Sequence, residues 1–220
     1  MSLLKQYRPH ALLALLVLVA TQASAHAINY ALANAPTQHV VRFYLKLGFQ
    51  HIIPEGFDHI LFVVGLCLIS TRIKTILWQA TAFTVAHTIT LALSMKGTIA
   101  VPAALVEPVI ALSIMFVAIE NLILSELKPW RIAVVFLFGL IHGMGFANSL
   151  NEIGLPPNKF FTSILAFNAG VELGQMAVIT AVFALIIFPL RGRVWYKKGV
   201  AYPLSILIAL VAFYWTMQRL

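Results

Sequence analysis

Six long apolar segments run through the sequence, and they restrict what this chain can fold into more than any other feature. They cover about residues 55–71, 75–95, 103–125, 131–149, 160–189 and 200–218. A helix needs about 20 mostly apolar residues to cross the ~30 Å hydrocarbon core of a bilayer. We therefore expect an all-α integral membrane protein, in which residues 54–220 form a bundle of about six transmembrane helices.

The composition supports a membrane protein and argues against several other classes. Of the 220 residues, 61% are apolar and 10% are charged, whereas charged residues make up about a quarter of a soluble domain. The net charge of +8 does not indicate a nucleic-acid partner, because the basic residues form no single cluster and lie mostly between apolar segments. The single cysteine, Cys67, excludes an intramolecular disulfide and a multi-cysteine metal site.

Residues 1–25 have the pattern of a cleavable signal peptide. A basic start precedes a short apolar core, and the segment ends in Ala23-Ser24-Ala25, which fits a signal peptidase site. The precursor would then hold seven apolar segments; the alternative is an uncleaved extra span. Residues 26–53 would follow as an extracytoplasmic segment, in which the stretch VRFYLKLGFQHII predicts an amphipathic helix on the outer surface.

Lysine and arginine residues indicate the orientation of the bundle, because cytoplasmic loops of membrane proteins carry an excess of both. With the mature N-terminus outside, the inner loops hold Arg72, Lys74, Lys128, Arg131, Arg191, Arg193, Lys197 and Lys198. The outer loops hold only Lys96 and Lys159, with Arg42, Lys46 and Arg219 in the flanking tails. We expect a multi-pass protein of the bacterial inner (cell) membrane with an extracytoplasmic mature N-terminus.

The fifth apolar segment is longer than a straight span. As one helix, residues 160–189 would extend about 45 Å. The segment must therefore tilt, break near Gly170 or Gly174, or protrude from the bilayer.

Ionisable side chains within the apolar segments are the main functional signal. A charge at the bilayer centre costs ~2.5–3.5 kcal/mol on insertion scales, so such groups must be paired, protonated or bound to a cation. By depth, several of them can converge in the outer half of the bundle. As metal ligands we select Asp58, His59, His87, His142, Glu107 and Glu172, with Asn168, Gln175, Glu120 and His51 in supporting positions.

The donor types and their neighbours favour a transition metal. Imidazole and carboxylate without thiolate suit nickel, zinc, cobalt or copper(II). Gly143 and Ala147 form a small face beside His142, which lets a neighbouring helix approach closely. The competing interpretation is structural for each residue alone, as a buried histidine bonded to a carbonyl or as a structural pair of Glu120 with Asn121.

Five blocks of sequence occur in one order between about residues 48 and 180. They are HIIPEGFDHILFVVGL, AFTVAHTITLALS, VEPVIALSI, FGLIHGMGFA and FNAGVELGQ. Together they resemble the HupE/UreJ family, in particular its second branch. The resemblance implies a membrane metal permease or accessory protein, often linked to nickel for hydrogenase and urease, and so implies metalloenzyme-maturation proteins as partners.

Members of that family pair a first-span pattern, His-Pro-x-x-Gly-x-Asp-His, with a later His-Gly motif. The residues that match here are Gly56, Asp58, His59, His142 and Gly143. The proline is displaced, because Pro54 follows His51 by three residues instead of one. For this reason His51 receives a supporting position and is not counted as a ligand.

The favoured interpretation is a permease or binding protein for a nickel-like divalent cation. Two alternatives stay open, one of which is an enzyme; the sequence favours a protein that is not an enzyme. A zinc-dependent intramembrane hydrolase of the ceramidase or adiponectin-receptor type would use His59, His87 and His142 as ligands and Asp58 or Glu107 as base, although no span carries a His-x-x-x-His pair. The other alternative is a metal-binding accessory protein that never transports.

Overall fold

The computed structural model describes residues 30–124 and 126–220, which are mostly helical and contain no strand. The helices are α3 (Thr37–Ile52), α4 (Phe57–Leu68), α5 (Ile73–Met95), α6 (Ala103–Ile123), α7 (Arg131–Ile153), η1 (Pro157–Lys159), α8 (Phe160–Val182), η2 (Phe183–Ile187), α9 (Phe188–Leu190), η3 (Lys197–Ala201) and α10 (Tyr202–Arg219). The signal peptide predicted at residues 1–25 lies outside the described residues, so it stays a prediction.

The predicted membrane architecture is confirmed. Five helical segments are long and apolar enough to cross a bilayer: Ile73–Met95, Ala103–Ile123, Arg131–Ile153, Pro157–Leu190 and Lys197–Arg219. A sixth span is possible if α3 and α4 count together, although they meet at a bend of 68°. Large apolar side chains such as Leu165, Leu185 and Leu210 are more than half exposed on the outside of the bundle, where lipid would cover them.

The bent pair corrects one detail of the sequence prediction. Residues 55–71 do not form a span by themselves, because α4 has 12 residues, equivalent to about 18 Å of helix. Helix α3 covers the stretch expected to be amphipathic, and it buries Val40, Tyr44, Gly48 and Ile52, which are spaced four residues apart on one face. Its extracytoplasmic placement stays a prediction.

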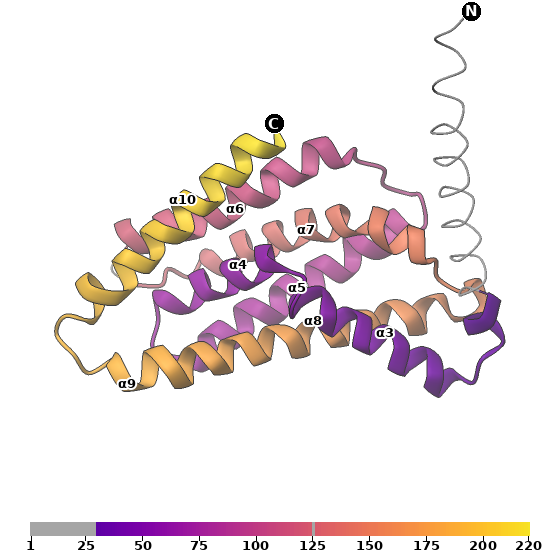
Figure 1. Ribbon diagram of the computed structural model, residues 1–220, viewed down its shortest axis with the longest axis horizontal. Coiled ribbons are helices and arrows are strands. Elements are labelled where there is room, and N and C mark those ends of the chain that lie inside the picture. The colour runs from indigo at the N-terminus through magenta and orange to yellow at the C-terminus, as the bar shows by residue number, and fades with distance from the viewer. Residues whose placement is uncertain (1–29, 125) are drawn as a thin grey trace, which may run out of the picture.

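Three helix pairs and one central helix make up the bundle. Figure 1 shows α6 beside α10 along one edge, α3 against α8 along the opposite edge, and α5 with α7 between them. The short helix α4 contacts α5, α6, α8 and α10. Because α4 lies among the other helices, His59 in its first turn is buried in the interior of the bundle, whereas Phe57 is exposed.

The bundle has two ends, which we name after an arginine at each. The Arg219 end contains the last residues of α5, α7 and α10 and the first residues of α6 and α8, as the contact between Arg219 and Glu107 indicates. The Arg131 end contains the opposite termini of these helices. Most loop arginines and lysines predicted to be cytoplasmic lie at the Arg131 end, among them Arg72 and Arg191, which line one cavity.

Glycines allow the paired helices to approach closely. A methyl group on Gly143 of α7 would overlap the His87 carbonyl and the Thr90 hydroxyl of α5. A methyl group on Gly170 of α8 would likewise overlap the Leu45 carbonyl of α3. These contacts agree with the packing that small residues give between membrane helices.

The long fifth segment is not broken at either glycine. Helix α8 continues through Gly170 and Gly174 to Val182, and the segment then changes to one turn of π-helix, Phe183–Ile187. The glycines act instead as contact points for α3, since a methyl group on Gly174 would meet the Ile52 side chain.

Substituting Gly143 should destabilise the bundle and separate α5 from α7. We expect Gly143→Ala to lower the free energy of unfolding by about 1–3 kcal/mol, because the added methyl group has no space. Gly192→Ala is the matched control, since nothing lies within 4 Å of a methyl group at that position. Denaturant unfolding of both variants in detergent measures the difference; equal stability of the two would contradict the packing described.

Candidate metal site

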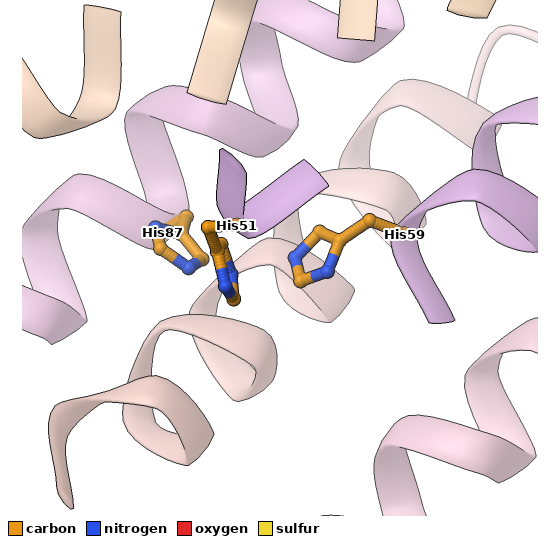
Figure 2. A group of neighbouring side chains, drawn as sticks. All are labelled: His51, His59 and His87. Carbon is orange, nitrogen blue, oxygen red and sulfur yellow. The ribbon is translucent and has the colours of Figure 1, made fainter. Parts of the chain in front are cut away.

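Three histidines from three helices meet in the interior of the bundle. They are His51 near the end of α3, His59 in the first turn of α4 and His87 in α5. Each offers one ring nitrogen, and these nitrogens all lie within 4.8 Å of one another. Figure 2 shows the three imidazole rings close together, with His51 drawn between His59 and His87.

The break between α3 and α4 creates half of this cluster. In a continuous helix, residues eight apart are separated by about 12 Å along the axis. Across the 68° bend, however, the ring centroids of His51 and His59 are only 4.7 Å apart. Pro54 and Gly56 lie in the break, so the displaced proline that weakened His51 as a candidate belongs to the bend that places it.

Hydrogen bonding fixes which nitrogen of His87 is free. The Asn168 amide nitrogen donates to the Ile164 carbonyl at 2.9 Å, which leaves the Asn168 oxygen facing His87 Nδ1 at 3.0 Å. That oxygen can only accept, so Nδ1 carries the proton and Nε2 keeps its lone pair. A polar partner that orients the ring in this way is common behind metal-bound histidines.

A fourth histidine, His142 of α7, borders the cluster. Its ring centroid lies 5.0 Å from that of His59. The Ser113 hydroxyl donates to the Ile110 carbonyl at 2.7 Å, so it must accept from His142 Nε2, which lies 3.0 Å away. The remaining nitrogen, Nδ1, therefore carries a lone pair.

All four histidines share one property that a structural role does not explain. His51 Nε2, His59 Nε2, His87 Nε2 and His142 Nδ1 are buried and lack a hydrogen-bond partner among the described residues. Buried polar atoms are normally paired, and leaving them unpaired costs free energy. The nitrogens of His51, His59 and His87, within 4.8 Å of one another, fit a borderline divalent cation such as nickel, cobalt, zinc or copper(II).

A cavity of about 730 Å³ connects the cluster with the Arg219 end. The side chains of His51, His59 and His142 form part of its wall. Four carboxylates also line it: Glu55, Asp58, Glu107 and Glu152. A cavity lined by acids raises the local concentration of cations.

Asp58 and Glu107, both predicted ligands, lie in this cavity and outside the three-histidine cluster. The Asp58 carboxylate forms a two-pronged ion pair with Arg219, at 3.0 and 3.2 Å. Arg219 also donates to the Glu107 backbone carbonyl at 3.4 Å, while the Glu107 side chain is exposed. Direct ligation by either acid stays a prediction.

Glu172 and Gln175 continue from His87 along the interface of α5 and α8. The Thr81 hydroxyl donates to Glu172 Oε1 at 2.6 Å, and the Thr84 hydroxyl lies 3.1 Å from Gln175 Oε1. Since α5 and α8 run in opposite directions, these contacts form a line of polar groups from the cluster towards the Arg131 end. Glu172 Oε2 is buried and has no hydrogen-bond partner in the described part of the chain.

Glu120 lies away from the cluster, near the Arg131 end. Its carboxylate forms a buried ion pair with Arg131 at 3.0 Å. Its neighbour Asn121 donates to the Gly65 carbonyl at 2.8 Å, so this region joins α4, α6 and α7. These contacts favour the structural interpretation of the Glu120–Asn121 pair.

Comparison with known proteins supplies the family. A family model described as HupE / UreJ protein matches residues 11–219, nearly the whole chain. No curated protein and no solved structure matched. The motifs that form the histidine cluster are the blocks from which the resemblance was inferred, and the match confirms that inference. The chain belongs to the HupE/UreJ family of membrane proteins.

Proposed function

We propose that this protein binds a nickel-like divalent cation at the cluster of His51, His59 and His87 and carries it across the membrane. Two observations support it most directly: each histidine offers one ring nitrogen within 4.8 Å of the others, and each has a buried Nε2 with no hydrogen-bond partner among the described residues. Membership of the family implies a role in metal transport or as an accessory protein, which agrees with this proposal.

The donor set indicates which cations the site would prefer. Magnesium and calcium select oxygen ligands, whereas imidazole nitrogens suit nickel, cobalt, zinc and copper. The cluster supplies neutral nitrogens only, so a bound divalent cation would keep its charge. The four carboxylates of the adjoining cavity would balance that charge without ligating the ion.

The cavity at the Arg219 end would be the route by which the cation reaches the histidines, from the extracytoplasmic side in the predicted orientation. At its wall, the Asp58 carboxylate is held by the Arg219 guanidinium. An arriving cation would compete with this guanidinium for the carboxylate. The pair is partly exposed, with 22% of the Arg219 and 26% of the Asp58 side chain accessible, so such an exchange costs little.

The polar groups between α5 and α8 offer the continuation towards the Arg131 end. The sequence carries no ATP-binding motif, so movement would follow the cation gradient, the membrane potential or a coupled proton. A cation beyond His87 would meet two pairs of oxygens, those of Thr84 with Gln175 and those of Thr81 with Glu172. Oxygens bind nickel-like cations less tightly than imidazole does, which favours onward release.

Two other functions would use the same cluster. Three histidines beside a cavity also fit a hydrolytic zinc ion with an open position for water. Asp58 is a poor base for that chemistry because both of its oxygens accept from Arg219. A non-transporting accessory protein would bind the cation but show no flux.

Removing one histidine of the cluster should abolish tight binding. We expect His51→Ala, His59→Ala and His87→Ala each to weaken nickel binding by about 100-fold or more, since changing even a residue behind a ligand costs about 10–100-fold. The matched control is His39→Ala, an exposed histidine of the same helix as His51. Binding is measured by calorimetry and flux in proteoliposomes with a metal-sensitive dye inside.

Nickel uptake into the proteoliposomes distinguishes the permease from the accessory protein and the enzyme. Uptake by the native protein that is lost in the three variants and kept in the control supports the permease. Binding without uptake assigns the accessory role, and lipid hydrolysis by the zinc-loaded protein assigns the enzyme. Unchanged nickel affinity in the three variants would refute the site itself.

Asn168 should act by orienting His87. We expect Asn168→Ala to weaken nickel binding by about 10–100-fold, because His87 Nδ1 then loses the Asn168 oxygen that accepts its hydrogen bond. Asn168→Asp keeps an acceptor oxygen and should retain most of the affinity. The same calorimetry measures both variants. If Asn168→Asp binds nickel more weakly than Asn168→Ala does, the contact does not orient the ring.

Arg219 should limit the rate at which cations reach the site. We expect Arg219→Gln to raise initial uptake several-fold at low salt, because the cavity becomes more negative, with the gain shrinking as ionic strength rises. Arg42→Gln is the control, as an exposed arginine of α3 that does not line the cavity. Stopped-flow uptake over a salt series measures both; a salt-independent change would speak against electrostatic control.

A further inference from the structure

A second cavity, of about 530 Å³, lies at the Arg131 end and takes no part in the proposed transport. Its wall comes from the link between α4 and α5, the end of α6 and the segment between α9 and α10. Its wall includes the basic residues Arg72, Arg191, Arg193 and Lys197, and the acid that the described residues contribute is Glu126. These cations come from two parts of the chain that are more than 100 residues apart.

The positive charge of this cavity exceeds what its own acid can balance. Like charges held around one space repel one another unless an anion lies between them. Cytoplasmic loops are basic in most membrane proteins, but that tendency alone does not direct side chains from separate loops to one cavity. These basic side chains are exposed, so solvent screens part of their repulsion, and an anion between them would relieve the rest.

An unpaired hydroxyl is an independent sign of a ligand. Tyr196 lines the cavity and is only 7% exposed, yet its hydroxyl has no hydrogen-bond partner among the described residues. Burial raises the pKa of Tyr196 above its ordinary value, so the hydroxyl stays a donor. Ser70 lines the same cavity and accepts from the Arg72 backbone N–H at 3.1 Å, which leaves its own proton free to donate.

Guanidinium groups together with hydroxyl donors match one ligand chemistry well. A phosphate group offers only acceptor oxygens and negative charge, and arginine binds it with two parallel hydrogen bonds. A carboxylate would use fewer of these donors. The cavity is therefore complementary to a phosphate group.

The surroundings indicate how that phosphate would be presented. Leu68, Leu124 and Leu127 form an apolar part of the wall. Val194 and Trp195 lie between the basic residues and are largely exposed, as expected for side chains at the boundary between lipid and water. Basic pockets between transmembrane helices on the cytoplasmic side commonly bind anionic headgroups.

We infer that this cavity binds the phosphate group of an anionic lipid headgroup. The lipid would link the segment after α9 to the start of α5. It would also lie beside Asn121, which lines the cavity and holds the Gly65 carbonyl of α4. Headgroup binding would thus stabilise the Arg131 end without touching the histidine cluster.

The test measures lipid binding by the full-length protein in detergent. Phosphatidylglycerol, phosphatidylcholine and inorganic phosphate are the probes, and the readouts are the melting temperature and the number of lipids retained in native mass spectrometry. We expect phosphatidylglycerol to raise the melting temperature by several degrees and to be retained, with little effect of phosphatidylcholine. Stabilisation by inorganic phosphate alone would keep the phosphate site but assign it to a free anion.

Variants separate a built site from general surface charge. Arg191→Gln with Arg193→Gln should abolish the effect of phosphatidylglycerol, and Tyr196→Phe should weaken its binding about tenfold by removing one donor to a charged acceptor. Lys198→Gln is the matched control, because Lys198 lies on the same segment and does not line the cavity. An equal loss in the control and in the arginine variants, or no stabilisation of the native protein by any probe, would overturn the inference.

Discussion

Unpaired imidazole nitrogens in the middle of an apolar bundle are the constraint on which the rest of this structure depends. Leaving these buried nitrogens unpaired costs free energy, and a bound cation would offset that cost. No carbonyl of residues 30–124 or 126–220 pairs with them. Instead, Asn168 and Ser113 bind the opposite ring nitrogens of His87 and His142, which keeps a lone pair available on each inward-facing atom.

The scaffold around these nitrogens serves to bring them together. Gly143 lets α7 approach the His87 carbonyl of α5, so His142 and His87 border one space. The bend between α3 and α4 does the same for His51 and His59. Because side chains from four helices take part, the site exists only in the packed bundle, and loosening one helix pair would disperse it.

Several parts of this arrangement could be predicted from the sequence. The apolar segments predicted the helices, the Gly143 face predicted close packing, and the HupE/UreJ motifs predicted the family that the comparison confirms. The position of His51 could not be predicted in the same way, because its distance from His59 depends on a backbone bend. The one available sign was a pair of histidines on either side of a Pro-x-Gly break.

What the sequence determined by itself is the chemistry, namely which segments are apolar enough for lipid and which polar side chains they carry with them. Hydropathy and side-chain type are local properties, so they can be read residue by residue. Only the tertiary structure decided which of these side chains contact one another. It placed Asp58 against Arg219 and Glu120 against Arg131, and left His51, His59 and His87 facing one another, because these pairings join residues far apart in the chain through helix packing.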